Sequence, residues 1–421
     1  MLLSDNKYGS PRLSDEILDC SMPMTFDQYG NCGFYCLYCF STYLRDKKNK
    51  LGSEKYYKRQ AVSSVSVTRF KKLFDPNTKS IFSYLIKKRR PFQWGGLSDP
   101  FCPLEEQFGV GLEILKFLAE IKYPVSFSSK GDLLLRNKQY WDAFMLNKEN
   151  YHYKATIITL NEDIQKKLEL GAPSPMRRFE VLGTLAGEGV ETTLRLRPYM
   201  PGITDKDIPE IIKIAADKGV KSVSAEFFCM DMRSNGRVRE KYRKISRLVG
   251  FDLFKFYRIL SSKRSNYLRL NYQYKEKYFG QLKHYCEKYG LRLHVSDAHH
   301  KELGCTGSCC GLPDDHPTLS NYQKSQFTNA IVKARQNGSV RFSEISEDFE
   351  WLKGFKWNVA KHASGADECN RKKWTMFEYM RNCWNDPKNH LSPYKYFGGA
   401  LVPDGLDENK DIIYKYAGVW K

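Results

Sequence analysis

Residues 30–40, with the sequence GNCGFYCLYCF, crowd three cysteines into one short aromatic stretch. Cys32, Cys36 and Cys39 follow a CxxxCxxC spacing, with no second pair of cysteines close by. A structural zinc site commonly takes four ligands as two separated pairs, whereas a four-iron cluster takes one ligand per iron. Three thiolates would therefore leave the fourth iron open to chelate a substrate. A zinc knuckle and a chance triplet of cysteines are the alternatives at this point.

The whole chain has the composition of a globular protein with a strong basic excess. Its 421 residues suit roughly two or three modest domains, and 41% of them are hydrophobic. Runs of about eighteen apolar residues are missing, so we expect no membrane partner, and the first residues lack the apolar core of a secretory signal. We expect a cytoplasmic protein, where cysteines bind metal or react more often than they form disulfides. The formal net charge of +20 favours polyanionic partners.

Strand and helix signals alternate downstream of the cysteines. Apolar or β-branched stretches predict strands at 24–30, 91–96, 123–129, 154–160, 191–200 and 220–228, and the intervening segments carry apolar residues at helical spacing. One such segment begins with Ser174 as N-cap and Pro175 in its first turn. About six β/α repeats imply an α/β fold whose parallel sheet curls into a partial barrel. Ligands bind at the carboxyl ends of such strands, where the cysteine loop also lies.

Three further stretches carry a resemblance to a known family. They are WGGLSDPFCPLE (94–105), SFSSKGDLLLRN (126–137) and LELGAPSPMRRFEVLGTLAGEGVETTLRLRPYMPGITD (168–205). Together with the cysteine motif, in this order over about residues 22–230, they resemble the spore photoproduct lyase-like branch of the radical SAM superfamily, the DNA repair photolyase group. In that superfamily the open iron of a [4Fe-4S] cluster binds S-adenosylmethionine (SAM), and reductive cleavage gives a 5′-deoxyadenosyl radical. The resemblance implies a partial (β/α)6 radical SAM barrel, both cofactors, and an electron donor such as flavodoxin or ferredoxin.

The resemblance also assigns roles by position. Cys32, Cys36 and Cys39 would hold the cluster, with Tyr38 and Phe40 covering it or the adenine. The other cofactor-binding positions follow the predicted strands: Gly95 and Gly96 for close approach to the methionine end, Ser98 and Asp99 for its amino or carboxylate group, Lys130 for the carboxylate, Thr156 or Thr159 for the ribose, and Arg195, Arg197 and Glu226 on the last strands.

Three of these positions have an equally simple structural interpretation. Asp99 precedes Pro100 and could be only a turn residue. Lys130 could be a solvated lysine at a strand end. An inward Glu226 also suits a buried ion pair with Arg195 or Arg197, which is the interpretation we favour for it.

A second cysteine group, in GCTGSCCGLP, comprises Cys305, Cys309 and Cys310. It predicts a second metal site, either an auxiliary iron–sulfur cluster or zinc, and a packed cysteine turn is the alternative. Candidate fourth ligands are His294, His299, His300 and Cys286. We expect an N-terminal segment (1–21), a radical SAM core (22–300) and a basic, aromatic-rich α+β extension (301–421). The interleaved basic and aromatic residues of the extension predict either a nucleic-acid face or a small aromatic core.

The expected activity is the modification or rearrangement of a nucleic-acid base, with DNA ahead of RNA as the partner because of the basic charge. A radical SAM enzyme acting on a peptide or small molecule, and a zinc-stabilised nucleic-acid-binding protein, remain alternatives. Known lyases of the branch carry a hydrogen-donating cysteine two residues before a Ser-Asp pair, where this chain has Gly96. The nearest thiol is Cys102, our candidate catalytic thiol, although we expect the intervening Pro-Phe step to turn it elsewhere. We therefore predict that the protein is not a genuine spore photoproduct lyase.

Overall fold

The computed structural model describes most of the chain. It covers residues 2–5, 7–14, 20–41, 61–232, 236–261, 267–324, 327–354, 374–389 and 391–418. The cysteine loop and every predicted site residue fall inside these ranges. Much of the basic aromatic stretch at 351–362, and the start of the one at 371–390, lie outside the described residues.

An eight-stranded sheet forms the centre of the molecule, in the order β12-β9-β8-β7-β6-β5-β3-β2. Its strands are β2 (Arg12–Leu13), β3 (Met24–Phe26), β5 (Phe92–Trp94), β6 (Val125–Ser129), β7 (Tyr151–Thr156), β8 (Glu191–Tyr199), β9 (Ser222–Phe227) and β12 (Arg292–Val295). All neighbours pair in parallel except β2 and β3, which are antiparallel. This confirms a mixed α/β fold with a predominantly parallel sheet.

Helices connect the parallel strands, as parallel pairing requires. They are α5 (Pro103–Phe108) and α6 (Val110–Glu120), α7 (Leu133–Arg136) and α8 (Lys138–Met145), α9 (Glu162–Leu168) and α10 (Pro175–Gly187), and α11 (Thr204–Asp217). Helices α12 (Gly236–Val249), α13 (Leu253–Leu260) and α14 (Tyr272–Lys288) separate β9 from β12. Helix α10 starts as predicted, because the Ser174 hydroxyl accepts a hydrogen bond from the Arg177 amide (3.2 Å) and Pro175 occupies the first turn.

The two faces of the sheet differ in chemistry, because side chains alternate along each strand. One face is apolar and packs with the helices in a single hydrophobic core that includes Phe127, Leu194 and Val223. The other, which we call the polar face, carries Gln93, Ser126, Ser128, His152, Lys154, Thr156, Thr193, Arg195, Arg197, Ser222, Ser224, Glu226, Arg292 and His294. Hydrogen bonds of 2.7–2.9 Å link Ser126, His152, Thr193 and Ser222 across four strands.

Smaller elements surround the sheet. Strand β1 (Leu2–Ser4) pairs with β4 (Ala61–Ser63), and β10 (Met230–Asp231) pairs with β11 (Tyr267–Leu268). Helices α3 (Val67–Lys72) and α4 (Ser83–Lys87) precede β5, and a 3-10 turn, η2 (Lys148–Asn150), precedes β7. Among the residues described, no helix is both long and apolar enough to cross a bilayer.

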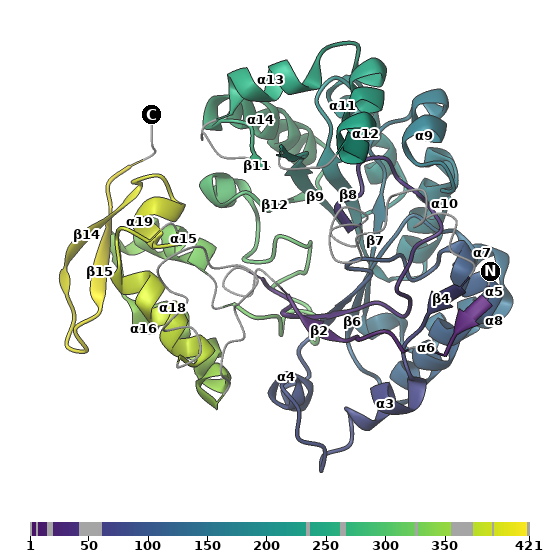
Figure 1. Cartoon of the computed structure of the whole chain (residues 1–421), viewed down its shortest axis with the longest axis horizontal. Helices are drawn as coiled ribbons and strands as arrows, with labels where there is room; N and C mark the ends of the chain where they lie inside the picture. The colour runs from purple at the N-terminus through teal and green to yellow at the C-terminus, as the bar shows by residue number, and fades with distance from the viewer. Residues whose placement is uncertain are drawn as a thin grey trace.

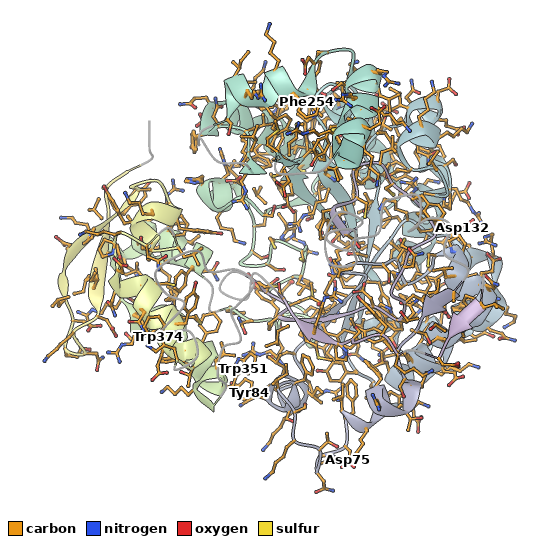
Figure 2. The ribbon with its side chains drawn as sticks, in the orientation of Figure 1. Asp75, Tyr84, Asp132, Phe254, Trp351 and Trp374 are labelled. Carbon is orange, nitrogen blue, oxygen red and sulfur yellow. The ribbon has the colours of Figure 1, made fainter. Side chains whose placement is uncertain are left out.

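The C-terminal elements lie beside the sheet, at the left of Figure 1. They are η3 (Ala298–Leu303), α15 (Phe327–Asn337), β13 (Ser339–Val340), α16 (Phe342–Ser346), η4 (Glu347–Gly354), α18 (Met376–Asn385), α19 (Pro393–Tyr396), β14 (Leu401–Leu406) and β15 (Ile412–Tyr416). Trp384 is fully buried among Phe327, Phe342 and Tyr414, so this part of the extension has the small aromatic core that was one of its two predictions. Tyr84 on α4 stacks on Trp351 of η4, with ring centroids 5.9 Å apart (Figure 2).

Candidate functional site

The three cysteines of the CxxxCxxC motif lie on the loop after β3, at the carboxyl edge of the sheet. Backbone hydrogen bonds join this loop to the segment after α9, from the Leu37 amide to the Leu168 carbonyl (2.8 Å) and from the Gly171 amide to the Phe34 carbonyl (3.1 Å). Burial raises the pKa of the Cys36 thiol, nearby Lys130 opposes this, and Glu169, Cys39 and Cys32 raise it further. The three thiols therefore influence one another's ionisation, and a nearby cation would stabilise their thiolate forms.

These residues fit the ligand set of a four-iron cluster in kind and number. Among the described residues, no three Cys, His, Asp or Glu side chains converge where a single metal ion could sit. A four-iron cluster takes each thiolate on a different iron, so its ligands need not converge on one point. Next to the loop, the Ser41 hydroxyl donates a hydrogen bond to the Leu97 carbonyl (2.7 Å). Ser98, the residue after Leu97, has a buried hydroxyl without a hydrogen-bond partner. That orphaned hydroxyl suits a polar cofactor group.

A buried ion pair between Glu169 and Arg178, which the sequence did not reveal, contacts the cysteine loop through Tyr38. Tyr38 donates its hydroxyl to Glu169, and Arg178 of α10 bridges the same carboxylate at 2.5 Å. Arg178 also donates to the Thr156 carbonyl at the end of β7 (2.8 Å). Both charged side chains are 1% exposed. The only signal in the sequence was the resemblance of 168–205 to the family, because nothing local predicts which carboxylate meets which arginine.

Tyr38 and Phe40 differ in their surroundings. Tyr38 is 8% exposed and carries the Lys130 ammonium over its ring at 5.8 Å from the centroid. Phe40 is 54% exposed. The expected covering role stays a prediction for both residues.

The loop of residues 95–99 is held by a buried carboxylate that sequence reasoning also missed. Asp27 accepts from the Leu97 and Ser98 amides, both at 2.8 Å, and pairs with Arg12 at 2.6 Å. Gly95 has a φ of +101°, and a Cβ atom there would lie 2.4 Å from the Ser128 carbonyl oxygen. Close approach to β6 thus explains this glycine without any cofactor.

Asp99 and Lys130 form the next part of the edge. Asp99 accepts from the Phe101 amide (2.9 Å), the Ser129 hydroxyl (2.7 Å) and the Lys130 amide (2.7 Å), so the turn interpretation describes it well. Burial lowers the pKa of Lys130, but Cys36, Glu169 and Asp99 together raise it above its usual value. Lys130 is therefore a partly buried cation facing the cysteine loop, not a solvated lysine.

Cys102 lies against the cysteine loop, which corrects our expectation that its side chain turns elsewhere. It caps α5 and is 1% exposed. A hydrogen bond between its thiol and Cys32 is the main reason that the pKa of Cys32 lies well above its usual value, and burial adds to it. The Pro-Phe step places residue 102 at the helix start, where its side chain points back to residue 32.

The predicted residues of the later strands divide between the polar face and the helices. Thr156, Arg195 and Arg197 lie on the polar face, with Arg195 donating weakly to the Thr156 hydroxyl (3.5 Å). Arg197 pairs with Glu226 at 3.6 Å, so the predicted partner is right. The pair is not buried as we expected, because the Glu226 side chain is 51% exposed. Thr159 instead donates to Asp207 of α11 (2.6 Å).

The second cysteine group does not form one cluster of thiols. The Cys309 and Cys310 sulfurs lie 3.8 Å apart, whereas Cys305 is exposed and its charge acts on Cys286 of α14. Residues 304–312, which we call the covering loop, cross the polar face. The Cys309 carbonyl accepts from Ser224 (2.9 Å) and Arg197 (2.7 Å), and His294 Nδ1 donates to the Ser308 carbonyl (3.0 Å). The second metal site stays a prediction.

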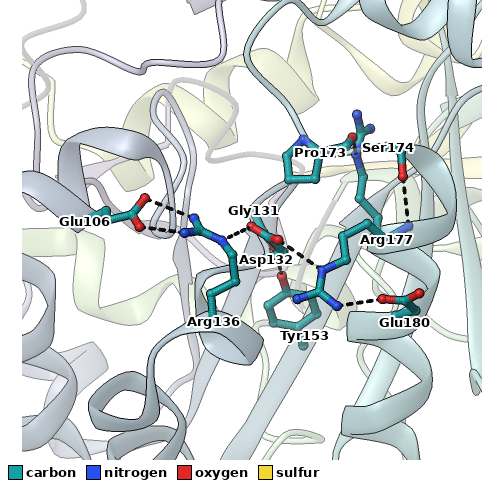
Figure 3. Close-up of polar contacts among 10 residues, drawn as sticks. Glu106, Gly131, Asp132, Arg136, Tyr153, Pro173, Ser174, Arg177 and Glu180 are labelled. Carbon is teal, nitrogen blue, oxygen red and sulfur yellow. Dashed lines mark hydrogen bonds and ion pairs between the residues drawn. The ribbon is translucent and has the colours of Figure 1, made fainter.

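A cavity of about 340 Å³ opens at the same edge, between Phe34 of the cysteine loop, Arg136 and Pro173. Figure 3 shows the ion pairs beside it. Arg136 bridges Glu106 and Asp132, and Arg177 bridges Asp132 and Glu180, at 2.5–3.1 Å. Asp132 is the residue shared by both arginines, and it keeps the turn after β6 in place next to the cysteine loop.

Comparison with known proteins gives matches of low identity. No protein-family model matches the chain. An uncharacterized protein of Methanocaldococcus jannaschii is 24% identical over 182 residues, which are 42% of this chain and 61% of that protein. A radical SAM Nα-GlyT isomerase of Pseudomonas phage M6 is 25% identical over 136 residues, 32% of this chain and 27% of the isomerase. The chain therefore spans less than two thirds of each of these relatives.

Among solved structures, a spore photoproduct lyase mutant with bound AdoMet and dinucleoside spore photoproduct has a TM-score of 0.48 at 13% identity. The match covers 66% of this chain and 78% of that one. SuiB of Streptococcus suis bound to S-adenosylmethionine has a TM-score of 0.35 at 13% identity, covering 66% of this chain and 59% of that one. The relatives and neighbours with named activities are radical SAM enzymes. In its cysteine motif and in its partial sequence match to the isomerase, the chain is similar to radical SAM enzymes.

Proposed function

We propose that the protein is a radical SAM enzyme that modifies or rearranges a nucleic-acid base, with DNA as the favoured substrate. The observation that carries the proposal is the three-thiol loop at the carboxyl edge of a parallel sheet, next to the Lys130 cation and the orphaned Ser98 hydroxyl. The sheet would be the partial (β/α)6 barrel of this superfamily, and the C-terminal extension would begin near residue 301.

Each residue of the edge has a proposed role. Cys32, Cys36 and Cys39 would each hold one iron, and a bound cluster would supply the electron that splits SAM into methionine and a 5′-deoxyadenosyl radical. Lys130 would attract the SAM carboxylate, and the Ser98 hydroxyl would donate to its polar end. Asp99, whose carboxylate already accepts three hydrogen bonds, would position Lys130 through the backbone amide of that residue.

The argument for nucleic acid comes from charge and from a groove between α12 and α13. A cavity of about 650 Å³ there is lined by Arg239, Arg243, Arg247 and Arg258. Met232, Phe251 and Phe254 supply an apolar side (Figure 2 labels Phe254). Glu240 pairs with both Arg243 and Arg247 at 3.1 Å, so one carboxylate is shared by two guanidinium groups. Arginine forks and apolar surface together suit phosphates flanked by bases.

Gly96 supports our proposal that the protein is not a genuine spore photoproduct lyase, because it stands where the lyases have their hydrogen donor. Cys102, whose thiol interacts with that of Cys32, would be the replacement donor if the proposal is wrong. The test is to supply spore-photoproduct dinucleotide to the reconstituted enzyme and look for restored thymines. Efficient repair that is lost in Cys102→Ala would contradict this proposal and make Cys102 the donor.

Anaerobic reconstitution tests the main proposal. We expect about four irons per chain or more, a brown protein, and 5′-deoxyadenosine on addition of a reductant such as reduced flavodoxin together with SAM. A mass change in added DNA, but not in peptides, would support the substrate class. Zinc without iron would favour the zinc-stabilised binding protein instead. The eleven described cysteines are all free thiols, which suits the reducing cytoplasm that we propose as its location.

A further inference from the structure

Three cationic side chains lie together on the polar face, at the centre of the sheet. Lys154 projects from β7 and is 1% exposed. Arg195 and Arg197 project from the neighbouring strand β8, where Arg195 is in register with Thr156, two residues beyond Lys154. The Arg197 side chain is 10% exposed. Alternation along the strands puts all three on the same side of the sheet.

The partners of these cations do not neutralise them. Lys154 donates to the neutral amide of Gln93, and Arg195 donates only weakly to the Thr156 hydroxyl. Arg197 donates to the Cys309 carbonyl and pairs at 3.6 Å with Glu226, whose side chain is 51% exposed, while its own Nε is buried without a hydrogen-bond partner. Among the described residues, these three cations thus share one half-exposed carboxylate. Another group beside them that can carry a negative charge is the Cys310 thiol, whose pKa is lowered by its hydrogen bond with Cys309 and further by Lys154 and Arg197.

Arg292, on the same face, differs from these three cations because carboxylates pair with its guanidinium group. It pairs with Glu191 on β8 and also reaches Asp315 at 3.7 Å. Buried charges in proteins are paired or bind an ion, because desolvation is otherwise strongly unfavourable. Burial is the main reason that the pKa of Lys154 is lowered to about 8, while Cys310 raises it and Arg195 and Arg197 lower it further. A ligand with negative charge would relieve both the desolvation and the repulsion.

We propose that Lys154, Arg195 and Arg197 form an anion subsite that binds a phosphate group of the nucleotide being modified. The choice of phosphate rests on the proposed nucleic-acid substrate and on the residues themselves. Two guanidinium forks and one ammonium match a group with several equivalent oxygens and up to two negative charges. Arg178, which donates to the Thr156 carbonyl and pairs with Glu169 below Tyr38, connects the strand end beside this subsite to the cysteine loop.

The covering loop completes the subsite. It crosses the polar face at Ser224 and Arg197, and Gly311 packs so closely on Thr193 that a Cβ atom there would lie 2.3 Å from the hydroxyl oxygen. The Cys309 and Cys310 thiols therefore border the same space as the cations. The burial of Lys154, which is 1% exposed, lowers the local dielectric constant and so strengthens the attraction between the cations and an anion.

Thermal unfolding of the reconstituted full chain with inorganic phosphate tests the subsite. At matched ionic strength, phosphate should raise the Tm of the wild type more than sodium chloride does. In Lys154→Met and Arg197→Met the apparent affinity for phosphate should fall at least tenfold. Lys166→Met is the matched control, because Lys166 is an exposed lysine paired with Glu162. Without phosphate, Lys154→Met should melt at or above the wild type, since it removes a buried charge.

Competition experiments identify which molecule supplies the phosphate group. A nucleoside 5′-monophosphate and a dinucleotide should compete with phosphate, while the matching nucleoside and acetate should not. An equal phosphate response in all variants would overturn the subsite. Loss of the phosphate response on adding SAM would also overturn it, because the cations would then bind the cofactor carboxylate. None of these readouts requires SAM cleavage, so they stay separate from a failure of the proposed function.

Discussion

At the scale of single residues, the candidate site depends on side chains whose surroundings are buried and charged. Cys36, Lys130, Tyr38, Glu169 and Arg178 form a continuous set from the cysteine loop to α10. Each group in such a set is costly to leave unpaired, because the low local dielectric strengthens both attraction and desolvation. Substitutions here should therefore separate residues that hold the cofactor from residues that hold the loop.

We predict that Cys32→Ala, Cys36→Ala and Cys39→Ala each abolish SAM cleavage while the chain stays folded. Each thiolate would hold one iron, so the loss of one should lose the cluster. The measurements are iron content, 5′-deoxyadenosine formation and far-UV circular dichroism. Cys383→Ala serves as the control, because it is a buried cysteine of α18 outside both cysteine groups. Retained 5′-deoxyadenosine in all three variants would end the cluster assignment.

Glu169→Gln should destabilise the protein by about 3–5 kcal/mol, because it leaves Arg178 buried without its carboxylate. Urea unfolding of the apoprotein measures this free energy. Glu162→Gln is the control, since its pair with Lys166 is exposed and should contribute about 0–1 kcal/mol. Equal losses in the two variants would mean that the buried pair does not hold the loop.

At the scale of elements, the loops after β3, β5 and β6 meet at one edge because their strands are adjacent and parallel. Asp27 fastens the loop of residues 95–99, and Asp99 fastens the start of the next loop through the Lys130 amide. Two buried carboxylates, those of Asp27 and Asp99, thus hold the three loops together by accepting hydrogen bonds from backbone amides.

Gly95→Ala should destabilise this edge by about 1–3 kcal/mol, because alanine is strained at φ +101° and its methyl group would meet the Ser128 carbonyl. Gly96→Ala is the matched control, since the nearest atom to its Cβ would be the end of the Arg12 side chain, at 3.1 Å, rather than a backbone carbonyl. Thermal unfolding with and without SAM should show the larger loss for Gly95→Ala. A larger loss for Gly96→Ala would point to cofactor contact at that position instead.

At the scale of the whole molecule, two separate groups of cationic side chains stand out among the residues that the structure describes. The groove between α12 and α13 is open and holds arginines beside an apolar side, whereas the polar-face cations are enclosed under the covering loop. We propose that the first binds the nucleic-acid backbone and the second a phosphate of the reacting nucleotide. The two should differ in salt dependence, because buried charges are screened far less than exposed ones.

Arg243→Glu and Arg247→Glu should weaken DNA binding several-fold and reduce the slope of log affinity against log salt by about one per lost phosphate contact. Fluorescence anisotropy over a range of salt concentrations measures both quantities. Lys138→Glu, an exposed lysine of α8, is the control for general charge. Unchanged affinity and slope in both arginine variants would exclude the groove as the DNA site.

The sequence by itself determined the alternation of strands and helices, the start of α10 and the place of the cysteine loop after a strand. These follow from periodicity, capping residues and spacing, which are local properties of the chain. Strand β7 was displaced: 154–160 was predicted and Tyr151–Thr156 observed, because a continuous apolar run has no alternation to mark its ends.

Only the tertiary structure decided which distant side chains meet. Glu169 with Arg178, Asp27 with residues 97 and 98, Cys102 with Cys32, and the covering loop with β8 and β9 join segments that are far apart in the sequence. Their encounter depends on strand order and on how loops pack at one edge, and neither is written in a local pattern. The polar face is the clearest case, because its three cations become one site only when β7 and β8 lie side by side.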